Sequence, residues 1–441
     1  MASFCTVILW RPSSKPYPTP TRNTYTTAYI QQFPISSTAP QTRRSLHLSS
    51  CGSVHNFDSL AVFSAANGNW LQAETGPFEK YNDDDFVVVN FYRFVFIENP
   101  AEEVSKHLSF VETEDLDLHG RIYLNEQGIN AQYSGPSKDA LKYVGWLKTD
   151  DRFSDILVQV SPAINGHAFP KLKLRYKPSL VQLEEGISHL PLLDPLMRAT
   201  PLTPSDWRSR LEARYKIDDL LDTKETDCIL LDVRNGYEWD IGHFQGAQRP
   251  NVDCFRSTSF GRSEPEVEIS DPLAAVDREK TDILMYCTGG IRCDVYSTIL
   301  RQQGFKRLYS LEGGVSHYLE SEGCTGWVGN LFVFDSRLSL PPSTYKPDDF
   351  SETSRNQNIP HSFAKCYVCG SLVSELRHRN CANLDCNLLF LCCLSCVDDL
   401  RGCCCIACTS AARLRPVLTE HRRYQKWHVY RDIELQGRPK T

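Results

Sequence analysis

The chain has 441 residues, of which 41% are hydrophobic and 23% are charged, as in an ordinary soluble protein. Its formal net charge of −6 gives no global basic field, so any nucleic acid would have to bind at a local patch. The length allows about two to four domains, and no apolar run approaches the roughly 20 residues that a membrane span needs.

The first 57 residues contain no aspartate or glutamate and are rich in serine, threonine and proline. Their basic residues are Arg11, Lys15, Arg22, Arg43 and Arg44. This composition predicts a transit peptide over residues 1–57, and its serine and threonine content favours the chloroplast stroma over the mitochondrion. A tail with no targeting role is the alternative.

The next segment has the order strand, helix, strand, strand, helix, strand. The predicted elements are strands at 86–97, on either side of 126–128, at 156–164 and at 171–183, and helices at 100–110 and 137–148. This order predicts a ferredoxin-like (acylphosphatase-like) α+β domain over residues 84–186, in which a sheet packs on two helices.

The last of these strands alternates basic with mostly apolar residues, which makes one of its faces cationic. The basic residues are Lys171, Lys173, Arg175 and Lys177. We expect these residues to contact RNA phosphates, and a solvated edge strand is the equal alternative.

Beyond a proline-rich boundary at 191–204, the pattern becomes that of an α/β domain over residues 205–330. The predicted elements are helices at 206–215 and 294–303, and strands at 227–233, 282–286 and 308–311. Strands separated by helices predict a parallel sheet, in which functional sites lie beyond the carboxyl ends of the strands. Cys287 directly follows one of these strands and is expected at such an end.

A six-residue loop runs from Cys287 to Arg292. Its central residues are Thr288, Gly289, Gly290 and Ile291. The two glycines permit left-handed backbone angles, so amide groups can point into one hollow and, with Arg292 and a helix N-terminus, stabilise an anion. A cysteine in such a cradle has a lowered pKa and reacts as a thiolate. The loop is therefore the predicted nucleophile site, and an inert buried cysteine is the alternative.

Eleven of the 18 cysteines fall between positions 366 and 408. They follow a predicted linker at 335–362 and form a predicted module at 363–410, where two cysteines separated by two residues can share one tetrahedral zinc ion. The predicted ligands are Cys366, Cys369, Cys381, Cys386, Cys393, Cys396, Cys403 and Cys408. A closed four-thiolate site is structural rather than catalytic. Redox-controlled disulfides are the alternative.

The tail at 411–441 is basic and carries Tyr424, Trp427 and Tyr430. Phosphate contacts and base stacking by such a tail suit single-stranded RNA. Packing of these rings on the protein is the equal alternative.

Three separated motifs resemble the rhodanese family, whose cysteine carries sulfane sulfur as a persulfide. They are DVRNGYEW with GHFQGA, the loop CTGGIR, and LEGG, in the family's order within residues 205–330. Cysteine phosphatases place five residues between cysteine and arginine, whereas this loop has four. The resemblance implies that Cys287 is catalytic and that Asp232 and Arg234 orient and brace its loop.

A longer resemblance, from about residue 84 to residue 410, is to the bacterial tRNA uridine(34) hydroxylase family. The motifs that carry it are GRIYLNEQGINAQYSG, FPKLKLRYK, CTGGIRC, GWVGNLFVFDSR and CANLDCNLLF. The resemblance implies formation of 5-hydroxyuridine at the tRNA wobble position with molecular oxygen. The chain departs from this family in having Asp294 and Val295 after the loop, where glutamate and lysine are usual.

Cys293 belongs to the pattern of the second family and not to that of rhodaneses in general. It is interpreted either as a resolving thiol for an oxidised or persulfide form of Cys287, or as a buried residue in the first turn of the helix. The first interpretation gives it a role in the chemistry, whereas the second does not.

The leading prediction is tRNA wobble-uridine hydroxylation by a chloroplast enzyme. Its catalytic set is Cys287, Arg292, Cys293, Asp232 and Arg234. The alternative is a sulfurtransferase that uses a Cys287 persulfide with a small-molecule sulfur donor or acceptor. A non-catalytic scaffold is a third hypothesis, against which the complete loop argues. We expect tRNA as the partner and structural zinc as the metal, and no flavin, haem or nucleotide motif is visible.

Overall fold

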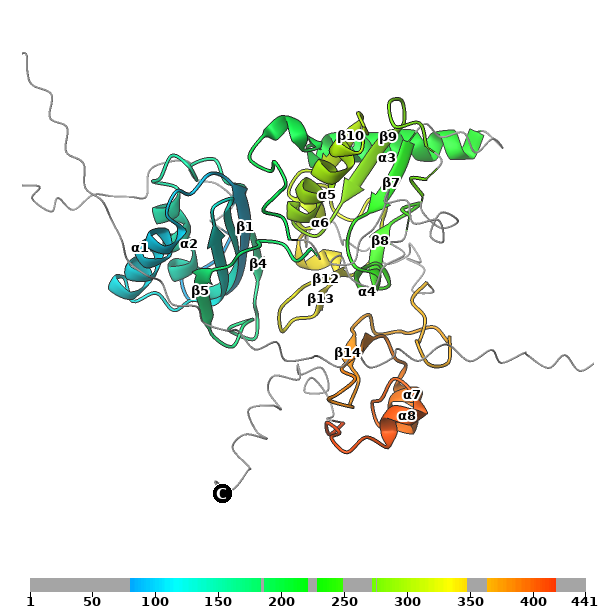
Figure 1. Cartoon of the computed structure of the whole chain (residues 1–441). Helices are drawn as coiled ribbons and strands as arrows, with labels where there is room; N and C mark the ends of the chain where they lie inside the picture. Colours follow the sequence, from blue (N-terminus) through cyan, green and yellow to red (C-terminus); the bar gives the residue numbers. More distant parts are fainter. Residues whose placement is uncertain are drawn as a thin grey trace, which may run out of the picture. The chain divides into compact units, whose positions relative to one another are not determined.

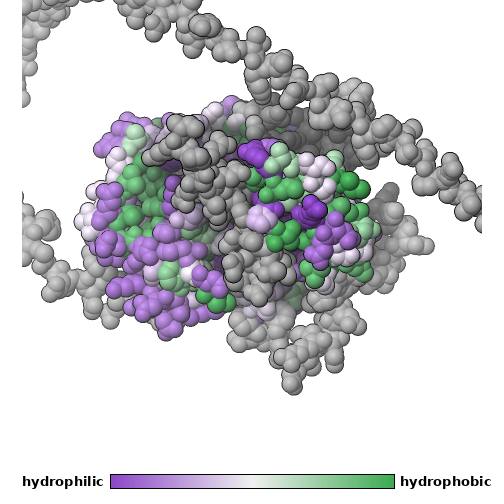
Figure 2. Space-filling model, turned by 90° about the horizontal axis from the view of Figure 1, so that it is seen from below, coloured by the Kyte–Doolittle hydropathy of each residue, from purple (hydrophilic) through white to green (hydrophobic). Residues whose placement is uncertain are grey.

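The computed structural model describes residues 80–183, 186–220, 228–248, 272–274, 276–346 and 363–417. The predicted transit peptide and the aromatic part of the predicted tail lie outside these residues. No helix in the described part of the chain is long and apolar enough to cross a membrane. Figure 2 shows hydrophilic and hydrophobic residues in adjoining groups on the coloured part of one face.

An N-terminal sheet of five strands has the order β4-β1-β3-β2-β5. Its strands are β1 (Phe86–Phe94), β2 (His119–Asn125), β3 (Gly128–Pro136), β4 (Gln159–Pro162) and β5 (Leu172–Tyr176). Helices α1 (Pro100–Thr113) and α2 (Ser137–Leu147) cover one of its faces (Figure 1). This is the predicted ferredoxin-like arrangement. The predicted strand at 171–183 is too long, because Pro178 has no N–H to continue the ladder beyond β5.

The alternation of side chains along β1 separates a packed face of this sheet from an open face. Val89 and Phe91 belong to the core beneath the two helices. Asn90 and Tyr92 alternate with them and therefore point to the other side. The strand register places two rows of residues across this open face. The first row is Asn90, Gln132, Arg121 and Lys173, and the second is Tyr92, Asn130, Tyr123 and Arg175.

A second sheet is parallel, as predicted, and has the order β6-β10-β9-β7. Its strands are β6 (Thr200–Leu202), β7 (Cys228–Asp232), β9 (Asp282–Tyr286) and β10 (Leu308–Leu311). Helix α5 (Ile291–Gln302) packs on one face, while α3 (Pro204–Leu220) and α6 (Gly314–Glu322) pack on the other. The predicted start of the helix at 294 is wrong, because Gly290 with φ 102° already acts as the N-cap and the chain turns helical at Ile291.

Shorter elements complete this region and the cysteine-rich region. The 3₁₀ helices are η1 (Pro195–Met197) and η3 (Pro342–Thr344), and the short α-helices are α4 (Gly236–Trp239), α7 (Leu394–Asp399) and α8 (Ile406–Thr409). Three pairs of short strands are antiparallel: β8 (Gly242–Phe244) with β11 (Trp327–Gly329), β12 (Leu331–Phe332) with β13 (Ser339–Leu340), and β14 (Arg379–Asn380) with β15 (Leu389–Phe390). Residues 335–346, expected to begin a linker, include β13 and the buried side chains of Asp335 and Tyr345.

Candidate active site

Cys287 lies at the carboxyl end of β9, where the alternation of that strand places it. Ile283 and Met285 face the core on the α5 side of the parallel sheet, and Cys287 continues the same face as a fully buried residue. The Gly290 amide donates to the Cys287 sulfur at 3.1 Å. At the start of α6, the Val315 amide donates to the Cys287 carbonyl oxygen at 2.9 Å. The loop is therefore held by backbone N–H groups of two helix starts.

The surroundings of Cys287 favour its thiolate. Burial tends to raise the pKa of Cys287, but a hydrogen bond from the Cys293 thiol, the charge of Arg292 and the amides of both residues outweigh burial and lower it to about 6. Burial and the neighbouring Cys287 thiolate raise the pKa of Cys293 well above its usual value. At neutral pH the pair is therefore a thiolate at Cys287 and a thiol at Cys293 that donates to it.

We expect iodoacetamide to alkylate Cys287 with a midpoint near pH 6. Cys228, whose pKa is raised by burial, should react only at higher pH and provides an internal comparison. Cys293→Ala removes the donor to the thiolate and should raise the Cys287 midpoint, whereas Cys293→Ser keeps a hydroxyl donor and should raise it less. Mass spectrometry of the alkylated peptides measures each midpoint, and a wild-type midpoint at about 8.5, the ordinary thiol value, would contradict the thiolate.

Arg292 is held by a buried carboxylate, that of Glu238, which was not among the predicted site residues. Its Nη1 and Nη2 donate to the two carboxylate oxygens of Glu238 at 2.5 and 2.9 Å. Thr288 donates to the same carboxylate at 3.0 Å and accepts from Arg292 Nη2 at 3.1 Å. The predicted cradle arginine is therefore neutralised by Glu238, which fixes the direction of its guanidinium group.

Glu238 is itself positioned by the start of α4. The side chain of Asn235 donates to Glu238 at 2.6 Å and its backbone amide donates at 3.1 Å. The two residues form a capping box. The Asn-x-x-Glu spacing is the sequence feature from which the position of Glu238 was predictable.

Asp232 and Arg234 form a second buried ion pair, which reaches the loop through Tyr286. Arg234 Nη2 donates to Asp232 Oδ2 at 2.7 Å and to the Gly242 carbonyl oxygen at 2.6 Å. The Tyr286 hydroxyl donates to Asp232 Oδ2 at 2.9 Å, and Tyr286 immediately precedes Cys287. This pair braces the end of β9, so its contact with the loop is indirect.

The open face of the N-terminal sheet packs directly against the loop. A Cβ atom on Gly289 would lie 2.7 Å from Asn90 Nδ2, and one on Gly290 would lie 2.9 Å from Tyr92 Oη. Gln159 accepts from Asn90 at 3.2 Å and donates at 2.5 Å to the carbonyl oxygen that precedes α6. The absence of a Cβ atom on both glycines thus permits this close approach without displacing the ends of the Asn90 and Tyr92 side chains. Both glycines were expected to permit left-handed backbone angles, and of the two it is Gly290 that adopts one, with φ 102°.

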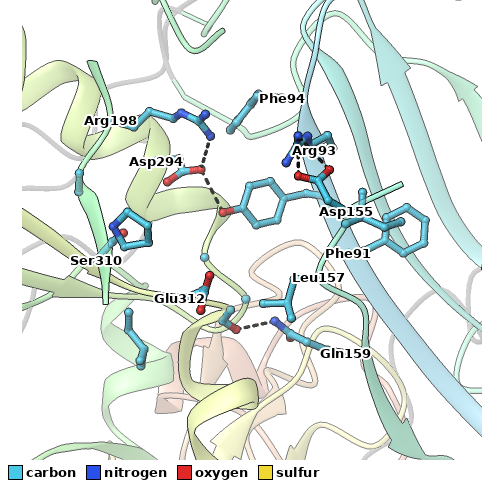
Figure 3. Close-up of a pocket in the computed structure, with 18 of the residues that line it drawn as sticks. Phe91, Arg93, Phe94, Asp155, Leu157, Gln159, Arg198, Asp294, Ser310 and Glu312 are labelled. Carbon is cyan, nitrogen blue, oxygen red and sulfur yellow. Dashed lines mark hydrogen bonds and ion pairs between the residues drawn. The ribbon is translucent and has the colours of Figure 1, made fainter. Parts of the chain in front are cut away.

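A cavity of about 340 Å³ lies between the loop and this open face, lined on one side by Gly289 and Gly290. Figure 3 shows Arg198 and Asp294 pointing toward one another at its border. Asp294 Oδ2 accepts from Arg198 Nη1 at 3.2 Å and from the Tyr92 hydroxyl at 3.0 Å. Burial raises the pKa of Asp294, although Arg198 and Tyr92 oppose this rise. The cavity therefore combines apolar walls with a largely buried carboxylate and a cation.

The predicted RNA-binding residues lie in and beside β5, the edge strand of the N-terminal sheet. Lys171, Lys173 and Arg175 are exposed. The charges of Arg175 and Lys177 lie 5.6 and 4.7 Å from the ring centroid of Tyr123. Lys173 and Arg175 stand on the open face, three strand spacings or about 14 Å from β1. The basic residues therefore share a face with the cavity without lining it.

Two groups of four cysteines converge in the cysteine-rich region. They are Cys366, Cys369, Cys393 and Cys396, and Cys381, Cys386, Cys404 and Cys408. The sulfur atoms of Cys369 and Cys393 are 3.7 Å apart, and that of Cys404 lies 3.7 Å from Cys386 and 3.8 Å from Cys408. Thiolates about 2.3 Å from one tetrahedral ion are about 3.8 Å apart, whereas a disulfide is about 2.05 Å long. Both groups therefore have the geometry of a metal site.

The predicted ligand Cys403 lies outside both groups, and Cys404 stands in its place. Spacing alone could not distinguish the consecutive cysteines at 403–405. A backbone hydrogen bond distinguishes them, because the Cys404 amide donates to the Cys381 sulfur at 3.4 Å. The Cys404 sulfur then lies in the same group as Cys381. Cys403 is buried in the small apolar core of this region, which also contains Ala382 and Phe390.

Family profiles match three consecutive parts of the chain. The UPF0176 acylphosphatase like domain matches residues 86–180, the Rhodanese-like domain matches 214–321, and the Rhodanase C-terminal family matches 328–409. These matches agree with the acylphosphatase-like and rhodanese folds expected from the sequence. The domain limits predicted above remain predictions.

Full-length relatives extend the similarity beyond single domains. The chain is 65% identical to "Rhodanese-like domain-containing protein 8, chloroplastic" of Arabidopsis thaliana over 82% of this chain and 84% of that protein. It is 37% identical to a tRNA uridine(34) hydroxylase of Protochlamydia amoebophila, over 79% of this chain and 96% of that protein. The corresponding protein of Chlamydia felis is 35% identical over 80% of this chain and 97% of that protein. The name of the plant relative agrees with the predicted chloroplast location.

Proposed function

We propose that this chain, which belongs to the tRNA uridine(34) hydroxylase family and carries its rhodanese domain, hydroxylates the wobble uridine of chloroplast tRNA at carbon 5. The similarity to relatives of that name over 96% and 97% of their length carries this proposal. A simple sulfurtransferase needs only the rhodanese domain, whereas this chain also matches the flanking parts. Sulfur transfer is the second candidate, because the lowered pKa of Cys287 suits a persulfide equally well.

The cavity beside the loop is the proposed binding site of the uracil base. Its volume of about 340 Å³ suits one flipped-out base, and the wobble base belongs to a single-stranded loop that can be turned out of its stack. Asp294 offers an acceptor and Arg198 a donor to the polar edge of uracil. Gly289 and Gly290 connect this cavity to Cys287 through a single loop.

The basic residues of the open face are proposed to hold the tRNA backbone. We expect Lys173→Ala with Arg175→Ala to weaken tRNA binding about 10-fold or more and to reduce the salt dependence of binding by roughly one unit per residue. The matched control is Lys138→Ala, because Lys138 is an exposed lysine of α2 on the helix-covered side of the sheet. This substitution should leave the affinity for tRNA and its salt dependence unchanged. Binding measured at several salt concentrations checks this, and an unchanged salt slope in the double variant would exclude a phosphate contact.

The two cysteine groups are proposed to hold one structural zinc ion each, because their sulfur separations fit four thiolates around one ion. We expect two zinc ions per chain, and chelation should unfold this module while leaving the parallel sheet folded. Cys404→Ser should lower the content to one zinc, whereas Cys403→Ser should keep two. Metal analysis of freshly reduced protein checks this. Absence of metal together with mapped disulfides would support redox thiols instead.

Loss of the gene tests the proposed function in the plant. Plastid tRNA from a line that lacks this protein should contain no 5-hydroxyuridine or derivative of it, and the wild-type gene should restore it. The Cys287→Ser gene should not. Unchanged wobble nucleosides in the null line would refute the proposal.

A further inference from the structure

A third group of metal-type side chains lies in the N-terminal sheet. It consists of Asp117, His119 and His167. His119 is the first residue of β2, Asp117 lies two residues before it, and His167 belongs to the segment before β5. The Nε2 atom of His119 lies 3.5 Å from Asp117 Oδ1, and that of His167 lies 3.0 Å from Asp117 Oδ2. The two imidazole rings stack with centroids 3.6 Å apart.

The partners of His119 fix its tautomer. Its Nδ1 atom lies 3.1 Å from the carbonyl oxygen of Phe169. A carbonyl oxygen only accepts, so Nδ1 carries the hydrogen and the neutral ring turns the Nε2 lone pair toward Asp117. An acceptor of the imidazole therefore faces an acceptor of the carboxylate.

Ser134 extends this pattern to His167. Its hydroxyl lies 3.3 Å from the His119 carbonyl oxygen and 3.4 Å from His167 Nδ1, and it accepts from the Ala168 amide at 2.9 Å. When the hydroxyl donates to the carbonyl oxygen, His167 Nδ1 must donate to Ser134. The Nε2 lone pair of His167 then also faces Asp117.

A cation between these three groups resolves the conflict. Histidines that bind metals donate their other ring N–H to a carbonyl or similar acceptor, as His119 does. Ligands about 2.1 Å from one ion are about 3.0 to 3.4 Å apart, close to the two distances at Asp117.

We propose that Asp117, His119 and His167 bind one divalent first-row transition-metal ion. Two imidazole nitrogens and one carboxylate oxygen suit such ions and leave further coordination positions open. These positions face water, since the side chains of Asp117 and His119 are 53% and 33% exposed. The site contains no thiolate and is therefore distinct from the two cysteine groups. It does not depend on the proposed function.

Cobalt titration of the zinc-loaded full-length protein tests the site. We expect one equivalent of Co2+ to bind by calorimetry without release of zinc and without thiolate–cobalt absorption. His167→Ala and Asp117→Asn should each weaken this binding at least about 10-fold, whereas His189→Ala, an exposed histidine elsewhere, should leave it unchanged. Binding that is absent below about 1 mM, or that survives both variants, would overturn the proposal.

Nitrogen-15 NMR of the histidine rings supplies an independent readout in the same protein. The metal-free His119 ring should be the neutral Nδ1–H tautomer, and Zn2+ should shift its Nε2 resonance. A His119 ring protonated on both nitrogens at neutral pH, with no change on adding metal, would show that an ion pair explains the cluster and would refute the metal site.

Discussion

Replacing Glu238 by glutamine is expected to destabilise the parallel sheet by about 3 kcal/mol, because it leaves the buried Arg292 charge without a counter-charge. Glu238 is fully buried and holds Arg292 through two hydrogen bonds of 2.5 and 2.9 Å. The amide oxygen of glutamine still accepts one of them, so the expected loss is near the lower end for a broken buried pair. Hydrogen exchange in peptides from β9 and α5 should become about 100-fold faster.

Glu279→Gln is the matched control for this substitution. Glu279 pairs with Lys306 at the surface, with both side chains largely exposed, so its loss should cost less than about 1 kcal/mol. Equal exchange rates in the Glu238→Gln and Glu279→Gln proteins would contradict the buried pair.

The contribution of Glu238 should also depend on pH. Burial acts to raise the pKa of Glu238, but Arg292 and other donors outweigh it, so the folded-state pKa lies below its ordinary value. A lowered folded-state pKa means that the carboxylate stabilises the fold at neutral pH and that this contribution is lost as the pH falls through the acidic range. The wild-type and Glu238→Gln proteins should therefore converge in stability at low pH.

Cys287→Ser should reduce every activity of the chain by about a thousand-fold or more, because both candidate reactions need the thiolate. Cys293→Ser should separate them. In the proposed hydroxylation, dioxygen gives one oxygen atom to carbon 5 of uridine and the other to water. The two additional electrons would come from the Cys287 thiolate and the Cys293 thiol as they form a disulfide, and the two protons from the Cys293 thiol and from water. Serine cannot supply these electrons, so hydroxylation should be lost.

Sulfur transfer should survive Cys293→Ser. The serine hydroxyl can still donate to the Cys287 thiolate, and a persulfide on Cys287 passes to an external acceptor without a second thiol. Cys324→Ser, at a partly buried cysteine outside the loop, is the matched control and should keep both activities. Hydroxylation at the wild-type rate by the Cys293→Ser protein would exclude the resolving role.

The local parts of this site were predictable from the sequence. The apolar strand before Cys287, the glycines after it and the helical spacing that follows are contiguous, and their pattern alone indicates a strand, a tight loop and a helix. The thiolate also follows from this local arrangement, since Cys293 and the amide donors lie within the loop and the first turn of α5.

The contacts between distant segments were not predictable in the same way. Glu238 meets Arg292 across 54 positions, and Tyr92 meets Asp294 across 202. Periodicity reports which face of an element is buried but not which residue lies opposite, so Glu238 and Tyr92 were missed. Among the cysteines, the spacing did not predict that Cys404 rather than Cys403 joins the second group of four, because this depends on the backbone hydrogen bond from Cys404 to Cys381.

The most direct test is nucleoside mass spectrometry of unmodified tRNA after incubation in air with the purified, reduced protein. The proposed function predicts 5-hydroxyuridine at position 34 with the wild-type protein and none with Cys287→Ser. Transfer of sulfur from thiosulfate to cyanide by a wild-type protein that forms no 5-hydroxyuridine would contradict it and establish the chain as a sulfurtransferase.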